Sequence, residues 1–176
     1  NTPGAPASFG AYLINNLGDP YVGSHYASDV CDLEREAVAW LMDLWDCGAP
    51  QGYWGSIGSS GSEGNLWALY LGREALDRPV LLHSADAHYS IPKAGRILRI
   101  ETRQVASHGD GSIDLASLRG VLAQLGGRSV ILALTCGTTM KGAHDDIGGA
   151  LAVLEYAGYA PGRRYVHVDG ALNAMV

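Results

Sequence analysis

Lysine is scarce in this sequence, and positive charge is concentrated nowhere along it. The 176 residues contain 12 Lys and Arg against 18 Asp and Glu, so the formal net charge is −6. The only lysines are Lys93 and Lys141. With a pI near 5.4, the chain has no basic stripe that could neutralise phosphates, and we expect no nucleic-acid partner.

Cysteine is also rare, and its spacing argues against two kinds of site. The three cysteines are odd in number and widely spaced, which fits neither a disulfide framework nor a zinc pattern: Cys31, Cys47 and Cys136. Three histidines lack metal-ligand spacing with carboxylates or thiols, so we expect no metal site: His83, His108 and His144. Free thiols are typical of a reducing compartment, and we expect a cytoplasmic protein.

Long apolar runs are absent as well. No run reaches the roughly 18 to 20 residues that a membrane-spanning helix needs, so we expect no membrane partner. No leader with a charged and then an apolar part is visible at the N-terminus. Because the chain begins with Asn1 rather than Met, an earlier leader that has been removed stays an alternative.

The composition that is present, 47% hydrophobic and 17% charged, is typical of a globular protein. Strand-like and helix-like segments alternate, which predicts an α/β fold: an open, mostly parallel sheet with helices on both faces. The apolar, β-branched run 129–135 predicts a central strand. We expect strands over 53–57, 79–83, 100–105, 129–135 and 164–168, and helices over 32–47, 66–76, 90–98, 114–125 and 146–156.

Residues 56–65, Ser-Ile-Gly-Ser-Ser-Gly-Ser-Glu-Gly-Asn, form a Gly- and Ser-rich segment ahead of an expected helix. Such a turn presents free backbone N–H groups to a phosphate, and its glycines let a ligand approach the backbone. Ser60 and Ser62 add hydroxyl donors. A Gly/Ser turn by itself is more often a plain connector, so its neighbours must decide between the two interpretations.

Three polar residues lie at or just after the ends of expected strands: His88, Thr138 and Asp169. Because strand ends of a parallel sheet meet at one edge, we expect them in one cleft. Asp169 could pair with a cationic ring nitrogen, bind a metal or cap a helix. His88 could act as a base, stack on a ring or be a core histidine, and Thr138 could line or cap a turn.

A phosphate-binding turn, a strand-end aspartate and a pocket histidine together suggest a phosphorylated aromatic cofactor. Pyridoxal phosphate fits this combination, because its pyridine nitrogen needs an acidic partner to stay protonated as an electron sink.

The ordered motifs resemble the group II pyridoxal-phosphate-dependent amino acid decarboxylases, most of all the histidine decarboxylase and serine decarboxylase branch. The likeness begins with Leu-Ile-Asn-Asn-Leu-Gly-Asp-Pro-Tyr at 13–21 and runs over nearly the whole chain. Its other motifs are Tyr-Trp-Gly at 53–55, Gly-Ser-Glu-Gly-Asn at 61–65, Asp-Ala-His-Tyr-Ser at 86–90, Gly-Thr-Thr at 137–139 with Asp-Asp-Ile at 145–147, and His-Val-Asp at 167–169.

The resemblance implies the type I fold of pyridoxal-phosphate enzymes, with 1–31 as a substrate-side loop segment and 32–176 as the cofactor-binding large domain. Ser60, Gly61 and Ser62 would hold the cofactor phosphate. Two residues would be catalytic, His88 stacked on the pyridine ring and Asp169 paired with its nitrogen. The other implied contacts are Thr138 and Ala171 near the cofactor, and Asn15, Asn16, Asp19 and Tyr21 on the substrate side.

The implied reaction is α-decarboxylation of an L-amino acid to an amine and carbon dioxide, by an enzyme that is a homodimer when intact. The family's Schiff-base lysine follows the aspartate strand, and neither Lys93 nor Lys141 matches it. We therefore expect the chain, which ends at Val176, to be a fragment that is inactive alone. Two alternatives remain: another type I pyridoxal-phosphate enzyme, such as a lyase or an aminotransferase, and a non-catalytic remnant or half-chain that needs a partner.

Overall fold

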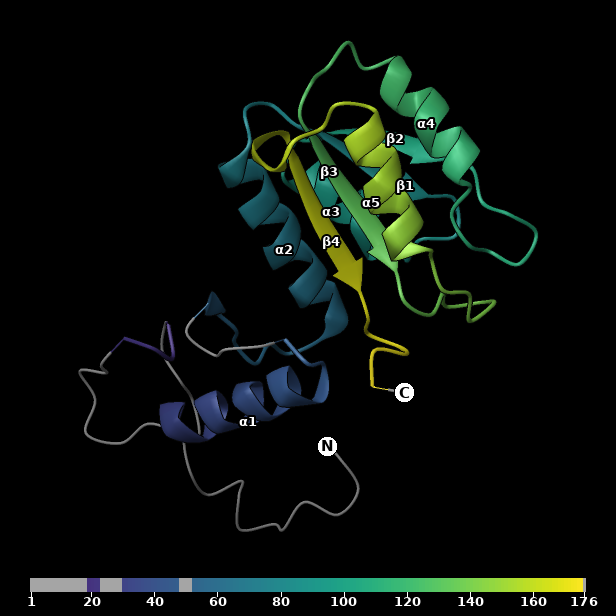
Figure 1. The fold of residues 1–176 in the computed structure, drawn as a ribbon. Coiled ribbons are helices and arrows are strands. Elements are labelled where there is room, and N and C mark those ends of the chain that lie inside the picture. Colours follow the sequence, from purple (N-terminus) through teal and green to yellow (C-terminus); the bar gives the residue numbers. More distant parts are fainter. Residues whose placement is uncertain (1–18, 23–29, 48–51, 176) are drawn as a thin grey trace. The chain divides into compact units, whose positions relative to one another are not determined.

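The computed structural model describes residues 19–22, 30–47 and 52–175. It separates into two compact units, Asn1–Gly58 and Ser59–Val176, which we call unit 1 and unit 2 (Figure 1). The candidate site described below is lined by residues of unit 2 alone, so the fold of that unit positions it.

Unit 1 contains the helix α1, Cys31–Leu44. The N-cap residue is Val30, which makes no side-chain capping hydrogen bond, and Asp32 lies inside the first turn. Val38 is buried, but several large apolar side chains of this helix are exposed: Leu33, Trp40 and Leu44. The helix expected over 32–47 is confirmed, although it begins one residue earlier and ends three residues earlier.

The strand expected over 53–57 is wrong. Within the described part of unit 1 this segment belongs to no sheet. Its polar groups bond to side chains instead: Ile57 N–H donates to Glu34 Oε1 over 2.8 Å, and Trp54 Nε1 donates to Asp19 Oδ1 over 3.1 Å. Aromatic and β-branched residues favour strands only where a neighbouring strand supplies backbone partners, and no strand among the described residues does so for this segment.

Unit 2 is built on a four-stranded sheet in the order β2-β1-β3-β4, in which every pair is parallel. Val80 of β1 lies opposite Glu101 of β2 and Val130 of β3. All six residues of β3 are buried, which confirms the predicted central strand. The bounds are β1 Val80–Ser84, β2 Glu101–Val105, β3 Val130–Thr135 and β4 Arg164–Asp169.

Helices cover both faces of this sheet, as expected from the alternation of elements (Figure 1). Because side chains alternate along a strand, Leu81 packs with Leu69 of α2 and Ile91 of α3, whereas Leu82 packs in the other cluster, which includes Leu118 of α4. The two clusters form one core layer on each face. The helices are α2 Gly61–Ala75, α3 Ser90–Ile97, α4 Leu115–Ala123 and α5 Ile147–Tyr156, and a short 3-10 turn, Pro161–Arg163, precedes β4.

Helix α2 begins at Gly61, five residues earlier than the apolar pattern predicted. Ser60 is the N-cap, and its Oγ accepts a hydrogen bond from Glu63 N–H over 3.4 Å. The Glu63 carboxylate bonds back to Ser59, a contact that lowers the pKa of Glu63. This reciprocal arrangement resembles a capping box and draws the Gly/Ser segment into the first helical turn.

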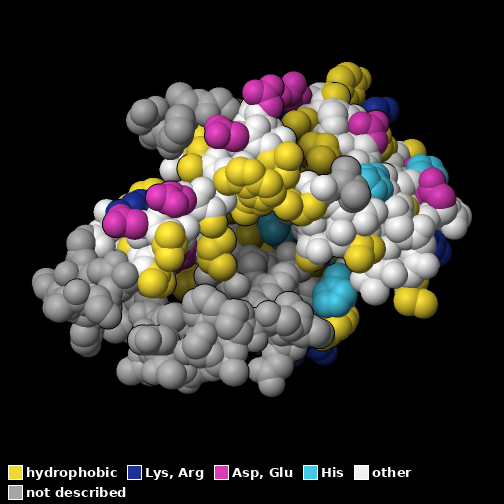
Figure 2. Space-filling model, turned by 90° about the horizontal axis from the view of Figure 1, so that it is seen from below, with side chains coloured by type: hydrophobic (Ala, Val, Ile, Leu, Met, Phe, Trp, Pro, Cys, Tyr) yellow, Lys and Arg dark blue, Asp and Glu magenta, His cyan; other side chains and the backbone are white. Residues whose placement is uncertain are grey.

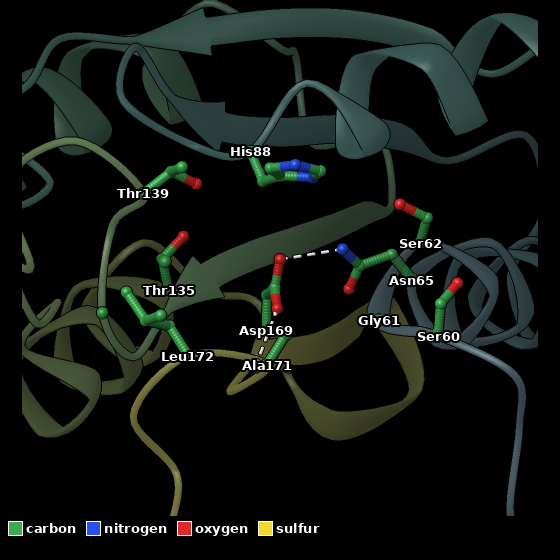
Figure 3. A pocket seen from close by; sticks show the side chains of 11 residues that line it. Ser60, Gly61, Ser62, Asn65, His88, Thr135, Thr139, Asp169, Ala171 and Leu172 are labelled. Carbon is green, nitrogen blue, oxygen red and sulfur yellow. Dashed lines mark hydrogen bonds between the residues drawn. The ribbon is translucent and has the colours of Figure 1, made fainter. Parts of the chain in front are cut away.

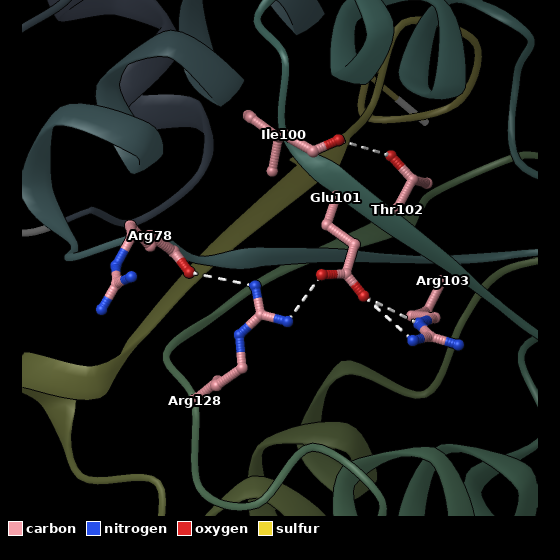
Figure 4. A network of polar contacts seen from close by, with 6 residues as sticks. All are labelled: Arg78, Ile100, Glu101, Thr102, Arg103 and Arg128. Carbon is pink, nitrogen blue, oxygen red and sulfur yellow. Dashed lines mark hydrogen bonds and ion pairs between the residues drawn. The ribbon is translucent and has the colours of Figure 1, made fainter.

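The edge strand β2 starts at a charged cluster (Figure 4). Glu101 lies 2.6 Å from Arg128 Nη1 and 3.0 Å from Arg103 Nη2, and Arg128 also donates to the carbonyl oxygen of Arg78 over 3.4 Å. These contacts lower the pKa of Glu101, and the hydrogen bond from Arg128 contributes most to this shift. Charged side chains at this position discourage pairing of the open edge with another strand.

The face of the molecule shown in Figure 2 carries side chains of several kinds. On the face shown in Figure 2, acidic, basic and hydrophobic side chains are interspersed, and Lys and Arg form no continuous patch on the visible part. None of the helices in the described ranges is long and apolar enough to cross a membrane. Neither the charge of the visible face nor a membrane-spanning helix marks a functional site, so the candidate site is recognised from its individual residues.

Asp145 joins two segments near the carboxyl end of β3. Its Oδ1 accepts the N–H of Ile113 over 2.7 Å, and its Oδ2 accepts the N–H of Thr135 over 2.7 Å. Burial raises the pKa of Asp145, while these two donors oppose the rise. The carboxylate thus satisfies two backbone groups that have no access to water.

We expect Asp145→Asn to lower the free energy of unfolding by about 1–3 kcal/mol, because an amide has one oxygen and leaves one buried N–H without an acceptor. Urea denaturation measures the change. Asp146→Asn is the matched control, because Asp146 caps α5 through Gly149 N–H and asparagine caps helices equally well. Equal stability of Asp145→Asn and the parent protein would contradict this assignment.

Candidate functional site

A pocket of about 270 Å³ lies in unit 2 beyond the carboxyl ends of β1, β3 and β4 (Figure 3). This is the edge at which open α/β sheets bind ligands, and the volume is close to the lower end of small-molecule sites, about 300 Å³. The lining residues are Ser60, Gly61, Ser62, Asn65, His88, Thr135, Gly137, Thr139, Asp169, Ala171 and Leu172. Six of the seven predicted cofactor-binding residues are among them, Thr138 being the exception.

The start of helix α2 forms one wall of the pocket, through Ser60, Gly61 and Ser62. The first N–H groups of a helix have no carbonyl partner within it, and the helix dipole makes this end positive. A side chain at Gly61 would not fit, because its Cβ would lie 2.7 Å from Cβ of Ala171. This close approach leaves a backbone surface at the pocket that suits an anion such as phosphate.

Asp169, the last residue of β4, brings a buried carboxylate to the pocket, with 7% of the residue exposed. Its Oδ2 accepts from Asn65 Nδ2 over 2.8 Å, and its Oδ1 accepts from Ala171 N–H over 3.1 Å. Among the described residues, no lysine or arginine forms a salt bridge with it. Buried charges are usually paired, so this carboxylate is suited to a cationic group that enters the pocket.

Asn65 of α2 is a site residue that sequence reasoning missed. It is 3% exposed, and its Nδ2 donates to Asp169 and also to Ser90 Oγ, each over 2.8 Å. Its Oδ1 lies 2.7 Å from His167 Nε2. The sequence did contain one signal for this role. Asn65 lies four residues before Leu69, on the same face of the helix, and an amide on the buried face of a helix needs polar partners.

His88, in the loop between β1 and α3, has its ring fixed from one side by Ser90. Its Nδ1 lies 2.7 Å from Ser90 Oγ and 3.3 Å from Ser90 N, whose hydrogen it accepts. A neutral ring that accepts at Nδ1 carries its proton on Nε2. Figure 3 shows this ring and the carboxylate of Asp169 on opposite sides of the pocket. Since Ser90 also bonds to Asn65, one polar network connects the two residues.

We predicted that Thr138 lies near a cofactor. In the structure its side chain makes a hydrogen bond within the protein. The residue is buried, and its Oγ1 accepts the N–H of Ala143 over 3.0 Å, which closes the turn 138–143. Thr139, the next residue, lines the pocket instead. The role predicted for Thr138 at a cofactor stays a prediction.

The predicted substrate-side residues belong to unit 1. Asn15 and Asn16 lie outside the described residues. Asp19 accepts hydrogen bonds from Tyr21 N–H over 2.9 Å and from the indole of Trp54, and Tyr21 is exposed. The substrate-side role of all four stays a prediction.

His167 supports the network from β4. Since Asn65 uses both amide hydrogens elsewhere, its oxygen accepts the hydrogen on His167 Nε2. Burial lowers the pKa of His167 below its usual value of 6.5, and the charge of Asp169 opposes this shift. The ring is therefore held in its neutral form.

This shift makes stability depend on pH. The unfolded chain binds a proton at His167 near pH 6.5, whereas the folded chain binds it only at lower pH, so the free energy of unfolding falls as the pH drops through that interval. The slope from one group is at most about 1.4 kcal/mol per pH unit. We expect His167→Gln, whose amide can still donate to Asn65, to lose this part of the slope in urea denaturation at several pH values.

A His167→Gln protein with the same pH dependence as the parent would show that burial does not keep His167 neutral in the folded chain.

Comparison with known proteins identifies relatives over nearly the whole chain. A family model described as the pyridoxal-dependent decarboxylase conserved domain matches residues 5–174. Histidine decarboxylase of Solanum lycopersicum is 37% identical over 166 residues, which cover 94% of this chain and 40% of that protein. Serine decarboxylase 3 of Oryza sativa subsp. japonica is 36% identical over 163 residues, which cover 93% of this chain and 36% of that protein.

The fold has solved counterparts as well. The crystal structure of L-methionine decarboxylase from Streptomyces sp. 590 matches with a TM-score of 0.84 and 26% identity, over 96% of this chain and 48% of that one. The chain thus spans about two-fifths of the length of the two curated relatives and about half of that crystallised chain. The match to the family model covers all the motifs around the pocket, and the chain belongs to the pyridoxal-dependent decarboxylase family.

Proposed function

We propose that this chain is the cofactor-binding part of a pyridoxal-phosphate-dependent carboxy-lyase that removes the α-carboxylate of an L-amino acid as carbon dioxide. The observation that carries the proposal is the buried carboxylate of Asp169, which has no cationic partner among the described residues and faces a pocket bounded by a helix N-terminus. The sequence relatives, named as histidine and serine decarboxylases, support the same reaction.

The residues at the pocket fit pyridoxal phosphate in three respects. The start of α2 at Ser60, Gly61 and Ser62 offers N–H and hydroxyl donors to a phosphate. Asp169 offers a buried anion to a protonated ring nitrogen. His88 offers a flat ring whose orientation Ser90 fixes, which suits stacking on an aromatic ligand.

When bound, pyridoxal phosphate supplies a ring that accepts the electrons released when the bond from Cα to the carboxylate breaks. The chain's own contribution is electrostatic. Asp169 would accept a hydrogen bond from the protonated ring nitrogen and would hold that proton in place. Asn65 and the N–H of Ala171 hold both carboxylate oxygens, so little reorganisation is needed during the reaction.

We further propose that the intact protein is a cytoplasmic homodimer, with residues 1–31 on the substrate side of the site and 32–176 as the cofactor-binding domain. Exposed apolar side chains of α1 support an interface with a second copy: Leu33, Trp40 and Leu44. The three free cysteines support a reducing compartment. Histidine and serine are the first substrates to test, because relatives that act on them are the most similar ones named above.

The function is tested by supplying the intact gene product with pyridoxal phosphate and a panel of L-amino acids. We expect carbon dioxide and the matching amine to appear in equal amounts from one amino acid. Asp169→Asn should lower the rate about 10²- to 10³-fold, the size of the loss when one preorganised electrostatic contact is removed. Asp110→Asn is the control, because this exposed carboxylate bonds only to the nearby Ser112 among the described residues.

Two outcomes would contradict the proposal. Consumption of an amino acid without release of carbon dioxide would indicate another class of pyridoxal-phosphate enzyme. No change in the absorbance spectrum of pyridoxal phosphate on adding the protein would indicate that the pocket does not bind this cofactor.

The polar network makes a separate prediction about cofactor affinity. Asn65→Ala removes one of the two hydrogen bonds that hold the Asp169 carboxylate, so this carboxylate is positioned less well for a ring nitrogen, and the dissociation constant for pyridoxal phosphate should rise about tenfold. Ser90→Ala removes the contact to His88 but leaves the bond from Asn65 to Asp169, and its effect should be smaller. Equilibrium dialysis measures both, and equal losses would show that Asn65 does not act through Asp169.

A further inference from the structure

Cys136 lies outside the pocket lining but directly beside it. It follows the last residue of β3, and its backbone N–H donates to the carbonyl oxygen of Asp169 over 2.8 Å. Both of its neighbours along the chain, Thr135 and Gly137, line the pocket. The residue is partly exposed, so a small reagent can reach its sulfur.

The sulfur of Cys136 contacts an imidazole. Cys136 and His144 face each other through an isolated antiparallel bridge, and Sγ lies 3.5 Å from His144 Nδ1. The other ring nitrogen of His144, Nε2, lies 3.1 Å from the side-chain amide of Asn173. Cysteine, histidine and asparagine are thus connected in series, with the ring between the thiol and the amide.

This series has the order of a nucleophile, a base and an orienting group. The oxygen and nitrogen of an asparagine amide exchange places by a half-turn, so Asn173 can accept the hydrogen on Nε2. Nδ1 of His144 is then free to take the proton of the thiol as the sulfur attacks. No function was expected for His144 from the sequence, and this arrangement gives it the role of a base.

The other two cysteines differ from Cys136 in exposure or in the printed contact of the sulfur. Cys31 is 6% exposed. Cys47 is less buried, and its sulfur contacts a carbonyl oxygen, that of Trp45, at 3.9 Å. Cys47 therefore serves as a reference thiol within the same molecule.

We propose that Cys136 is a thiol-modification site that forms a mixed disulfide with small-molecule disulfides, with His144 as the base and Asn173 as the positioning residue. In this step Nδ1 of His144 takes the thiol proton, and Sγ attacks one sulfur of the reagent. The disulfide bond of the reagent breaks as the new one forms. The released thiolate takes the proton from His144, so the reagent is the only oxidant required.

Modification should also disturb the turn after β4. Sγ of Cys136 contacts the ring of His144, and that ring contacts Asn173, which also packs closely on Gly137. A group attached to the sulfur replaces the contact between Sγ and Nδ1, so His144 and Asn173 should shift. Asn173 belongs to the turn that carries Ala171 and Leu172 into the pocket.

The first experiment uses a coloured aromatic disulfide, dithiobis(nitrobenzoate), at neutral pH, with peptide mass spectrometry to assign each modified cysteine. We expect Cys136 to react about tenfold faster than Cys47, because an imidazole contacts the sulfur of Cys136, whereas a carbonyl oxygen contacts that of Cys47. His144→Gln should reduce the rate at Cys136 to that at Cys47, and Asn173→Ala should give an intermediate rate. Because Cys47 is measured in the same molecule, a folding defect that exposes thiols generally would raise both rates and be recognised.

Equal rates at Cys136 and Cys47 in the parent protein, or an unchanged rate in His144→Gln, would overturn the proposal. The second measurement is amide hydrogen exchange over 169–175 before and after modification. Faster exchange that dithiothreitol reverses, and that is absent in Cys136→Ser, is expected, and unchanged exchange would overturn the link to the turn. Neither readout depends on whether the pocket binds pyridoxal phosphate.

Discussion

The organisation of this site depends on a buried negative charge at the end of β4. A carboxylate removed from water is unfavourable unless hydrogen bonds and a cation compensate it, and Asp169 receives two hydrogen bonds from within unit 2. One comes from Asn65, which also bonds to Ser90 and His167. The position of the His88 ring and the inward face of α2 both follow from satisfying that one group.

The parallel sheet determines which groups can meet around this charge. The order β2-β1-β3-β4 places the ends of β3 and β4 side by side, and the loop after β1 brings His88 to the same edge. Helix α2 completes the arrangement, because Gly61 allows its first turn to approach Ala171 closely. The N-terminus of α2, which suits an anion, and the carboxylate of Asp169, which suits a cation, therefore line one pocket. This arrangement suits a ligand with a phosphate at one end and a protonated ring nitrogen at the other.

Much of this could be predicted from the sequence, and the exceptions have physical causes. The run 129–135 is mostly apolar and β-branched, which favours a buried strand, and the meeting of His88 with Asp169 follows from parallel topology. The segment 53–57 has strand-like residues but no partner strand, which local sequence does not reveal. The early start of α2 depends on Glu63 reaching back to Ser59, and the role of Asn65 depends on partners about 25 and 100 residues away.

The most direct test of this account is a crystal structure of the protein with pyridoxal phosphate bound. The account predicts the ring nitrogen at hydrogen-bond distance from Asp169, the phosphate at the N–H groups of Gly61 and Ser62, and the His88 ring against the pyridine. A cofactor turned so that its phosphate lies away from α2, or whose ring nitrogen contacts a group other than Asp169, would contradict it.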